Sequence, residues 1–568
     1  MNRILGLKKA NCKSCHKCIR ECPVKSIQFS DHQANILPEE CILCGRCVVA
    51  CPQNAKDVRR DVDMVKKAIR DGRRVVASVA PSFIVDFDAQ SLGEMETWLK
   101  ELGFSCARET AEGAYIVKKE YERLIKSKEQ RVLISTCCHS TVLLVEKYYP
   151  EAIKYLAPVL SPMLAHAKLI KEEDPEAYVV FIGPCISKKD EADKNPGLVD
   201  CVLTYEELRE WFADEKVELT PSEIAKNDIR VSRFFPETGG IIKSMDTEDS
   251  EYRYIAVDGV KDCIAALKSI ISGKTTDCFV EMSICRGSCI NGPMVRRYRE
   301  EMLDCTVKLR DFAKPRGKAE REDFDIKTNV NIEQKFAPLT VNHLKPSEEE
   351  INKTLESIGK TKPEHELNCG CCGYATCREK ATAVFLGKAE PSMCLPFMME
   401  KAESFSDKII MMTPNAIMVL DDELNIQQMN RSAKRLFNLQ ASLNVKGMAA
   451  KEIIDTKPYV AILASSQVRL EQRRYLAEYD KYVQESILYD KEHKIIICIM
   501  KDITDEQVEN RRVNEIRRQT VNTADKVIEK QMRVVQEIAS LLGETTAETK
   551  IALTKLKEAI SVEGSVDE

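Results

Sequence analysis

Hydrophobic and polar positions follow different periods in different parts of this chain. Between about residue 64 and residue 311, short runs rich in β-branched residues alternate with amphipathic stretches of helical period. This alternation is typical of α/β domains, in which helices join parallel strands. We predict strands in the runs 74–80, 131–135, 178–182 and 200–203.

Beyond residue 400 the pattern changes to shorter strands. The runs 416–420 and 425–429 flank an Asp-Asp pair, which predicts a β-hairpin, and a short helical stretch follows them. Strand-like residues then continue from 474 to 503. This succession predicts a compact domain of the α+β class.

The end of the chain, from about 506, has the pattern of one long helix. Four apolar residues stand seven positions apart in it, Val521, Ile528, Val535 and Leu542. Such a stripe suits a coiled coil, although Gln531 occupies the same seam. We expect a symmetric partner helix to cover the stripe, and hence a homodimer.

A charged, aperiodic segment separates the two folded parts. Residues 312–345 have the composition of a linker, and Ser347 with Glu350 predicts a capping box that opens a helix. The chain is therefore expected to be a multidomain protein of mixed α+β and α/β class. Its predicted parts are residues 1–60, 64–311, the linker 312–345, residues 346–400, 401–505 and the helical tail 506–568.

Composition narrows the class of protein. The chain has 568 residues, 44% hydrophobic and 31% charged, with a formal net charge of −5. It can bury several cores and is neither disordered nor fibrous, and the balance of charges favours neither nucleic acid nor a membrane as partner. Because no apolar run approaches the roughly 20 residues of a membrane span and the N-terminus does not have the pattern of a secretory signal, we expect a cytoplasmic protein. Disulfides are disfavoured there, so its 24 cysteines indicate metal or thiol chemistry.

The first cysteines form an internal repeat. Two Cys-x2-Cys-x2-Cys-x3-Cys-Pro runs begin at Cys12 and Cys41, 29 residues apart. This motif resembles that of bacterial two-cluster ferredoxins, in which the fourth cysteine of each run binds the other 4Fe-4S cluster. The resemblance implies one cluster on Cys12, Cys15, Cys18 and Cys51, and another on Cys41, Cys44, Cys47 and Cys22. A structural zinc site is the alternative.

Three further cysteine loops follow in the middle of the chain, at 135–140, 183–191 and 281–292. Their spacing and order, with the flanking segments 148–151 and 238–240, resemble the catalytic domain of the FeFe (iron-only) hydrogenases. In that family a 4Fe-4S cluster is joined through one thiolate to a di-iron site that carries CO, cyanide and a dithiolate. The resemblance implies that Cys138, Cys185, Cys285 and Cys289 bind this H-cluster, with Cys289 as the bridge.

The same resemblance assigns five other residues around the di-iron site. It implies that Lys188 binds one cyanide, that Pro81 and Ser82 contact the other, and that Phe235 lines the pocket. Cys137 matches the thiol that relays protons. The alternative for Cys137 is a small, buried apolar residue.

Departures from the family pattern indicate a slow enzyme. Catalytic members have methionines where this chain has Gly183 and Ser283, so we expect a pocket that is roomier or more polar. Tyr121, Leu124 and Ala157 replace the usual proton-relay residues, although Glu120 and Glu122 lie nearby in the sequence. A broken relay slows proton transfer. These changes resemble those of the sensory FeFe-hydrogenases.

A third cysteine group and a sensory module complete the chain. Cys369, Cys372, Cys377 and Cys394 resemble a small 4Fe-4S domain, with Cys371 as a spare thiol. Four sets of four ligands then imply four 4Fe-4S clusters in all. Residues 401–505 resemble a PAS domain, in which His493 has the surroundings of a solvated residue.

The leading interpretation is a sensory hydrogenase that reacts slowly and reversibly with H2 and passes redox state to a PAS and helical output. Implied partners are H2 and protons, a redox protein such as ferredoxin, maturation proteins for the di-iron site, and a signalling protein such as a phosphatase or kinase. Two alternatives are an efficient ferredoxin-linked hydrogenase and an iron-sulfur scaffold that has no di-iron unit.

Overall fold

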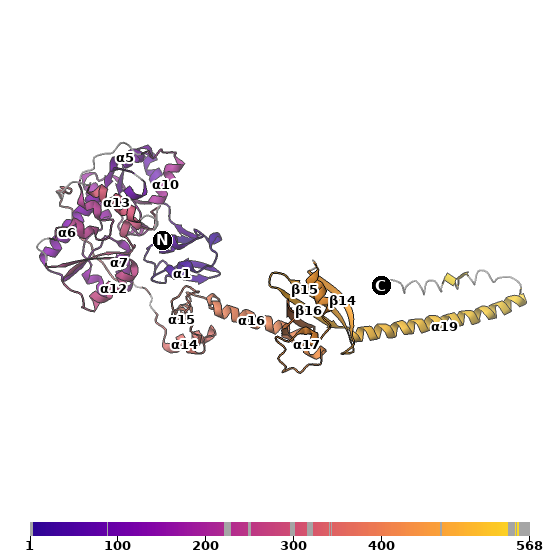
Figure 1. Cartoon of the computed structure of the whole chain (residues 1–568). Coiled ribbons are helices and arrows are strands. Elements are labelled where there is room, and N and C mark those ends of the chain that lie inside the picture. The colour runs from indigo at the N-terminus through magenta and orange to yellow at the C-terminus, as the bar shows by residue number, and fades with distance from the viewer. Residues whose placement is uncertain are drawn as a thin grey trace. The chain divides into compact units, whose positions relative to one another are not determined.

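The computed structural model consists of two compact units, 1–398 and 399–568 (Figure 1). It describes residues 4–87, 89–220, 229–247, 251–295, 302–314, 322–339, 341, 344–465, 468–542, 551–552 and 554–555. The predicted tail 506–568 therefore lies partly outside the described residues. No helix among the described residues is both long and apolar enough to cross a membrane.

The chain begins with a small ferredoxin-like segment. Strand β1 (Leu5–Leu7) pairs antiparallel with β4 (Lys56–Val58), and β2 (Ile27–Ser30) forms a hairpin with β3 (Gln33–Ile36). Two short helices, α1 (Lys17–Glu21) and α2 (Arg46–Ala50), each follow a cysteine loop. Ile19, Ile27 and Ile42 are fully buried and form its apolar interior.

Two parallel sheets form the central domain. One has the order β6-β5-β8-β9 and the other β10-β11-β7, and every neighbouring pair is parallel. The strands are β5 (Val75–Val79), β6 (Cys106–Glu109), β7 (Val132–Ile134), β8 (Tyr178–Gly183), β9 (Cys201–Thr204), β10 (Arg253–Asp258) and β11 (Cys278–Ser283). The four predicted strand runs and their parallel arrangement are confirmed.

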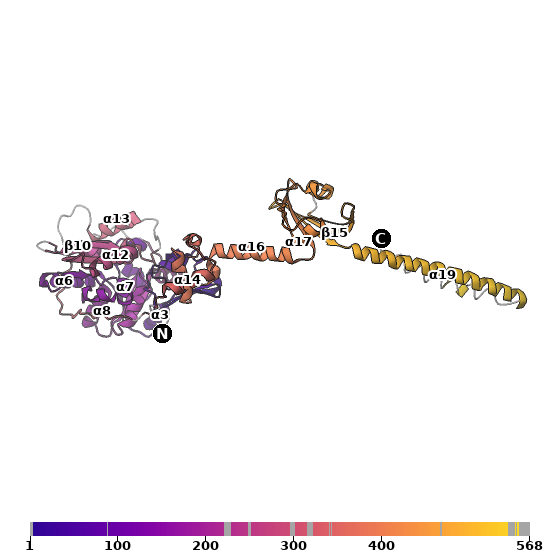
Figure 2. The same cartoon turned by 90° about the horizontal axis from the view of Figure 1, so that it is seen from below.

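Helices connect and cover these strands, as parallel sheets require (Figure 2). They are α3 (Val62–Arg70), α4 (Phe83–Asp86), α5 (Leu92–Glu101), α6 (Ala111–Ser127), α7 (His139–Tyr148), α8 (Pro162–Glu173), α9 (Ser187–Lys194), α10 (Tyr205–Asp214), α11 (Gly240–Ser244), α12 (Val260–Ile271) and α13 (Met302–Ala313). Every residue of β5 and β8 is buried, which explains why these strands are continuously apolar rather than alternating.

Part of the segment predicted as a linker belongs to the central domain. Phe312 is buried at the end of α13, and Val330 and Ile332 pack in the same core as helices α6 and α8. The backbone N–H of Leu160 donates to the carbonyl of Ile332 at 2.8 Å. Asp323 in this segment is mostly buried and pairs with Lys118, whereas Glu322, Asp325, Lys327, Glu333 and Lys335 are exposed. The few buried apolar residues among these charges show no regular period in the sequence.

The third cysteine domain, residues 346–396, follows. The predicted capping box at Ser347 and Glu350 is present and opens α14 (Glu348–Ser357). Helix α15 (Cys377–Phe385) packs against α14, and Figures 1 and 2 both show this domain beside the ferredoxin-like segment.

The second unit contains a five-stranded antiparallel sheet of order β13-β12-β16-β15-β14. The predicted hairpin is β12 (Ala416–Asp421) with β13 (Ile426–Met429), and the later strands are β14 (Arg469–Leu476), β15 (Lys481–Asp490) and β16 (Ile495–Asp502). Helices α17 (Arg431–Leu436) and α18 (Lys457–Ala464) lie between β13 and β14 in sequence, α16 (Leu395–Met412) precedes the sheet and α19 (Thr504–Leu542) follows it. The predicted hairpin is thus present, and the predicted tail is helical as far as Leu542.

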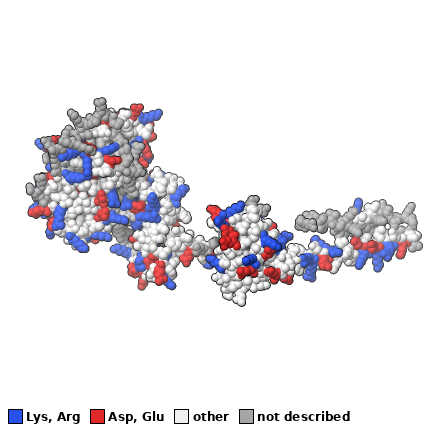
Figure 3. Space-filling view, viewed as in Figure 1, with Lys and Arg blue, Asp and Glu red and all other residues white. Residues whose placement is uncertain are grey.

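Basic and acidic side chains are interspersed over the visible faces of both units (Figure 3).

Candidate metal centres

The first two cysteine runs fold into two loops with the same backbone. Ser14 (φ 53°) and His16 (φ 56°) in the first run correspond to Leu43 (φ 53°) and Gly45 (φ 70°) in the second. These left-handed residues turn the chain between cysteines, so that successive thiols face one centre. The sequence repeat is therefore a structural repeat.

Four cysteines line one small cavity beside each loop. One cavity is lined by Cys12, Cys15, Cys18 and Cys51, and the other by Cys22, Cys41, Cys44 and Cys47. The last cysteine of each run thus lies with the first three of the other run, which is the expected crossed grouping. Burial raises the pKa of the Cys41 and Cys47 thiols, so their thiolates need a nearby cation, which iron ligation supplies.

A third cavity gathers the cysteines of the third cysteine domain. It is lined by Cys369, Cys372, Cys377 and Cys394 together with Tyr374 and Lys380. Cys371 is exposed and is not among the residues that line this cavity. Within the described residues, no three His, Cys, Asp or Glu side chains are grouped tightly enough to hold one metal ion.

The central set lies at the carboxyl ends of parallel strands, where α/β folds place their ligands. Cys138 comes after β7 and caps α7, Cys185 follows β8, and Cys285 and Cys289 follow β11. Burial raises the pKa of Cys285, and the nearby Cys185, Cys138 and Cys289 add to the increase. The four thiols therefore converge on one place inside the domain, with a donor set that suits an iron-sulfur cluster.

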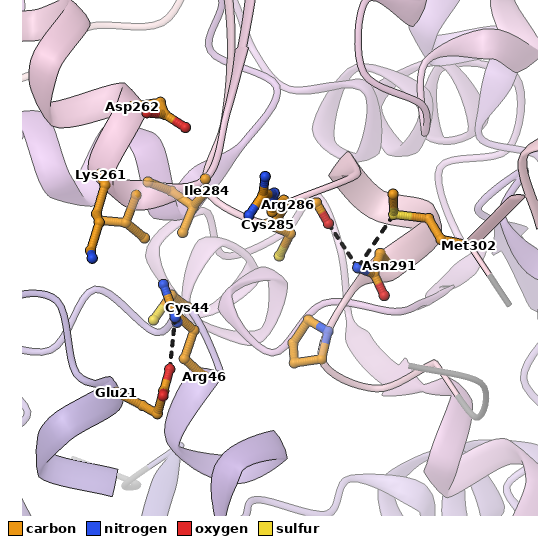
Figure 4. Close-up of a pocket in the computed structure, with 13 residues that line it drawn as sticks. Glu21, Cys44, Arg46, Lys261, Asp262, Ile284, Cys285, Arg286, Asn291 and Met302 are labelled. Atoms are coloured by element: carbon orange, nitrogen blue, oxygen red, sulfur yellow. Dashed lines mark hydrogen bonds and ion pairs between the residues drawn. The ribbon is translucent and has the colours of Figure 1, made fainter. Parts of the chain in front are cut away.

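One larger cavity, of about 590 Å³, connects this central set with the second ferredoxin-type set (Figure 4). Cys44 and Cys285 both line it, from different segments of the chain. The ion pair between Arg46 and Glu21, at 2.7 Å, forms part of its wall. The two cysteine sets are thus neighbours in the fold.

Lys188 and Cys137 lie next to the central set. The Lys188 ammonium donates to the Cys137 carbonyl at 3.1 Å and pairs with Glu191 at 2.5 Å. Burial disfavours the charge of Lys188, but Glu191 outweighs that effect and raises the pKa of Lys188. Burial raises the pKa of Cys137 to about 12, so the thiol keeps its proton. Its sulfur lies 3.3 Å from the Tyr121 hydroxyl.

Pro81, Ser82 and Phe235 pack within the central domain. The Ser82 hydroxyl lies 2.7 Å from the Tyr205 hydroxyl, which donates to the carbonyl of Ala80 at 3.1 Å. Pro81 and Ser82 are buried, and Phe235 packs against the same apolar cluster as Cys137. The structure thus brings the residues of the middle loops together.

The two departures from the family pattern have different consequences. A Cβ at Gly183 would lie 2.6 Å from the Phe181 ring, so Phe181 fills that space and the expected extra room is absent there. At Ser283 the hydroxyl lies 3.0 Å from that of Ser288. The pocket is therefore more polar at position 283 and not roomier at position 183.

Two buried polar residues near the site were not predicted. Glu281 accepts backbone N–H bonds from Gly239 at 2.8 Å and Ile242 at 3.1 Å, and burial raises the pKa of Glu281 to about 7. Tyr205 supports Ser82 from α10. Glu281 lies within a cysteine loop and could have been flagged as a carboxylate in an apolar run, whereas no local signal marks Tyr205.

Three family models match parts of the chain. Residues 73–293 match the iron only hydrogenase large subunit, C-terminal domain; residues 5–59 match a 4Fe-4S dicluster domain; and residues 366–396 match an Fe-S cluster family. The solved FeFe-hydrogenase HydA1 of Chlamydomonas reinhardtii has a TM-score of 0.37 at 18% identity, over 44% of this chain and 88% of that chain.

Two curated relatives share the central region. Iron hydrogenase 1 of Clostridium pasteurianum is 24% identical over 381 residues, which cover 48% of this chain and 66% of the relative. The cytosolic Fe-S cluster assembly factor NAR1 of Kluyveromyces lactis is 23% identical over 207 residues, covering 33% of this chain and 43% of the relative. The chain thus spans less than two thirds of each relative. It carries an FeFe-hydrogenase-like domain over residues 73–293, together with 4Fe-4S ferredoxin-type segments.

Proposed function

We propose that this protein is a sensory FeFe-hydrogenase that reacts slowly and reversibly with H2, as H2 = 2H⁺ + 2e⁻. The observation that carries the proposal is the convergence of four thiols, three partly buried and that of Cys289 exposed, with Lys188 and Cys137 at the carboxyl ends of the central strands. A site that held only a structural cluster would have no need for a charged lysine and a spare thiol beside it.

Four sets of four cysteines would hold four 4Fe-4S clusters, one of them within an H-cluster whose di-iron part carries CO, cyanide and dithiolate ligands. When bound, this group supplies the redox chemistry with H2. Lys188 provides a fixed positive charge for an anionic ligand, and its pairing with Glu191 holds that charge in place. Cys137 holds a proton at its sulfur, beside Tyr121.

Slow turnover follows from the proton path. Tyr121 keeps its own proton because burial raises its pKa well above the ordinary value. Glu120 forms an ion pair with Arg123 at 2.6 Å, and Glu122 accepts from the backbone of Asp246 at 2.9 Å. Either carboxylate must therefore break its present interaction before it can relay protons in place of the usual residues.

The second unit is the output. Its hairpin, helices and three further strands support a PAS-like sensory domain over 401–505, and α19 supports a transmitting helix. We infer a cytoplasmic homodimer that exchanges electrons with a ferredoxin-like protein, needs maturation proteins for its di-iron site, and signals to a separate protein such as a phosphatase or kinase.

Infrared spectroscopy of the full chain, matured without oxygen, tests this function. CO and cyanide bands, with iron near sixteen cluster irons and two more, are the expected result for four cubes and one di-iron site. Bands that are absent after maturation, with the clusters filled, would leave the scaffold function instead.

That scaffold is the second candidate, because NAR1 proteins match the same region. An efficient ferredoxin-linked hydrogenase is distinguished by rate: it requires fast H2 turnover, which Tyr121, Leu124 and Ala157 oppose.

A further inference from the structure

The third cysteine domain packs on the ferredoxin-like segment through directed polar contacts. Gln28 donates to the carbonyl of Gly387 at 2.9 Å, and the backbone N–H of Phe29 donates to that of Lys388 at 2.8 Å. Lys388 also pairs with Glu40 at 2.6 Å, with both side chains mostly buried. These contacts fix the orientation of the two domains, because backbone groups and a shielded ion pair allow little sliding.

Lys25 lies at the centre of this contact. Its backbone is left-handed, with φ 51°, and its ammonium donates to the carbonyls of Ile19 and Gly373, each at 3.0 Å. The same ammonium lies 5.6 Å from the centre of the Tyr374 ring. One side chain therefore ties both domains together.

Tyr374 lies between two cysteine sets. The residue is 3% exposed, its ring lines the cavity of the third set, and its hydroxyl is buried without a hydrogen-bond partner among the described residues. Cys22 and Cys372, one from each set, both act electrostatically on Lys25 and on Tyr374. A buried hydroxyl without a hydrogen-bond acceptor lowers the stability of the fold, unless a bound group accepts a hydrogen bond from it.

Close packing beside Tyr374 depends on a glycine. Gly373 has φ 89°, and a Cβ there would lie 3.1 Å from the His16 carbonyl oxygen and 3.1 Å from a methyl group of Ile19. A larger residue would push the two domains apart. Gly373 therefore allows the third cysteine domain to pack closely against the ferredoxin-like segment.

We propose that Lys25 and Tyr374 form an electron-transfer junction between the set Cys22, Cys41, Cys44 and Cys47 and the set Cys369, Cys372, Cys377 and Cys394, with the Tyr374 hydroxyl donating to the group held by the third set. The proposal rests on the proposed function, in that both sets hold 4Fe-4S clusters. One electron passes across the junction: the site that loses it is oxidised, the other is reduced, and no bond or proton moves. Because the second set also adjoins the central set, this junction extends the series of neighbouring cysteine sets from the central domain to the third cysteine domain.

The test is electron paramagnetic resonance of the reconstituted full chain during a potential titration. Fully reduced protein should show magnetic interaction between two neighbouring clusters. Tyr374→Phe, which removes only the hydroxyl, should shift the potential of the third site to more negative values, because hydrogen bonds to cluster sulfur favour the reduced state. Lys25→Gln should shift it the same way by removal of a positive charge. Lys9→Gln, at an exposed lysine of the same segment, should leave it unchanged.

Two glycine variants distinguish the docking of the two domains from the reduction potential of the third set. Gly373→Ala should weaken the magnetic interaction and speed hydrogen exchange at the Phe29 amide. Gly197→Ala, outside this interface, should do neither, because a Cβ there meets no atom within 4 Å at a similar φ of 87°. Two results obtained with full iron content would overturn the junction alone. One is the absence of a magnetic interaction between the clusters. The other is a reduction potential of the third set that neither Tyr374→Phe nor Lys25→Gln changes. A third set without iron in the full chain would overturn the junction together with the proposed cluster count.

Discussion

Cys137 contributes a thiol that keeps its proton at ordinary pH, since burial raises its pKa to about 12. Its sulfur contacts the Tyr121 hydroxyl at 3.3 Å, and its carbonyl anchors Lys188. A thiol in this position can deliver protons repeatedly to a group bound nearby only if a second neighbouring group returns a proton to it. Within the part of the chain that the structure describes, Tyr121 supplies the one hydroxyl at hydrogen-bond distance from the Cys137 sulfur.

Cys137→Ala should therefore lower H2 turnover by roughly 10²-fold, the usual scale for loss of a positioned proton-transfer group. Infrared bands of the matured variant should stay in place, because the Cys137 side chain is not among the proposed ligands. Cys106→Ala, at a half-buried cysteine outside the ligand sets, is the control and should retain its rate. An unchanged rate in Cys137→Ala would show that protons arrive by another path.

Gly183→Met, which restores the residue of catalytic members, should destabilise this protein. The new Cβ would meet the Phe181 ring at 2.6 Å, and overpacking of this kind costs about 1–3 kcal/mol. Phe181→Ala in the same chain should recover part of the loss. Denaturant unfolding measures both variants, and a Gly183→Met protein as stable as the parent would contradict the packing at this site.

Sequence reasoning succeeded at the residue scale where the relation is local. Cysteine spacing within one short loop fixes which three thiols face one centre, as in the two ferredoxin-type runs, whereas the fourth member of each set followed from the family resemblance. Sequence reasoning failed where the contacting residue is not adjacent in the sequence pattern. Phe181 fills the space at Gly183, and Tyr121, counted as a lost relay residue, turns out to contact Cys137.

Helix α9 shows how one element joins two domains. Lys189 on α9 is fully buried, and its ammonium pairs with Asp61 at 2.8 Å and Glu207 at 3.0 Å and donates to the carbonyl of Val202 at 2.7 Å. Asp61 directly precedes α3, and Glu207 belongs to the capping box of α10. The end of the ferredoxin-like segment is thereby tied to the central domain.

Lys189→Met should cost about 3–5 kcal/mol of unfolding free energy, since it removes the cation that pairs with the buried Glu207 and leaves Arg59 as the ion-pair partner of Asp61. Lys194→Met, on the same helix, removes an ion pair with Asp190 whose lysine is 43% exposed, and should cost no more than about 1 kcal/mol. Thermal or denaturant unfolding of the two variants compares them directly. Equal losses would show that the buried cluster is not the main tie.

Elements were predictable where their pattern was long or strongly apolar. The runs that became β5 and β8 are buried throughout, and α19 has a long helical period. By contrast, β10 has no fully buried residue, and residues 322–339 hold their few apolar side chains in no regular period. Such segments are placed by contacts with the rest of the fold, which a single-sequence pattern does not contain.

On the scale of the whole molecule, helices α16 and α19 present apolar residues in a heptad spacing. In α16, Met398, Phe405 and Met412 stand seven apart, with Ile409 between the last two, and are 39%, 65%, 83% and 55% exposed respectively. Helix α19 has 39 residues and carries the predicted seam of Val521, Ile528 and Val535, which are half-buried. An isolated helix of this kind gains most of its stability from a partner.

The full chain should therefore be a homodimer in solution, with both helices in parallel contact with their copies. Phe405→Glu with Ile409→Glu should weaken the dimer, because two charges replace apolar residues of the α16 seam. A chain ending at residue 505 should also weaken it, because the α19 seam is removed. Both changes leave the core of the sheet intact. Ser404→Glu, on an exposed position of α16 outside the seam and its flanking positions, controls for added negative charge and should remain dimeric. Sedimentation equilibrium over a range of concentrations measures the mass. If the unaltered full chain is a monomer throughout that range, the two stripes are not dimer seams, and a transmitter that works by shifting one helix against its copy is ruled out for this protein.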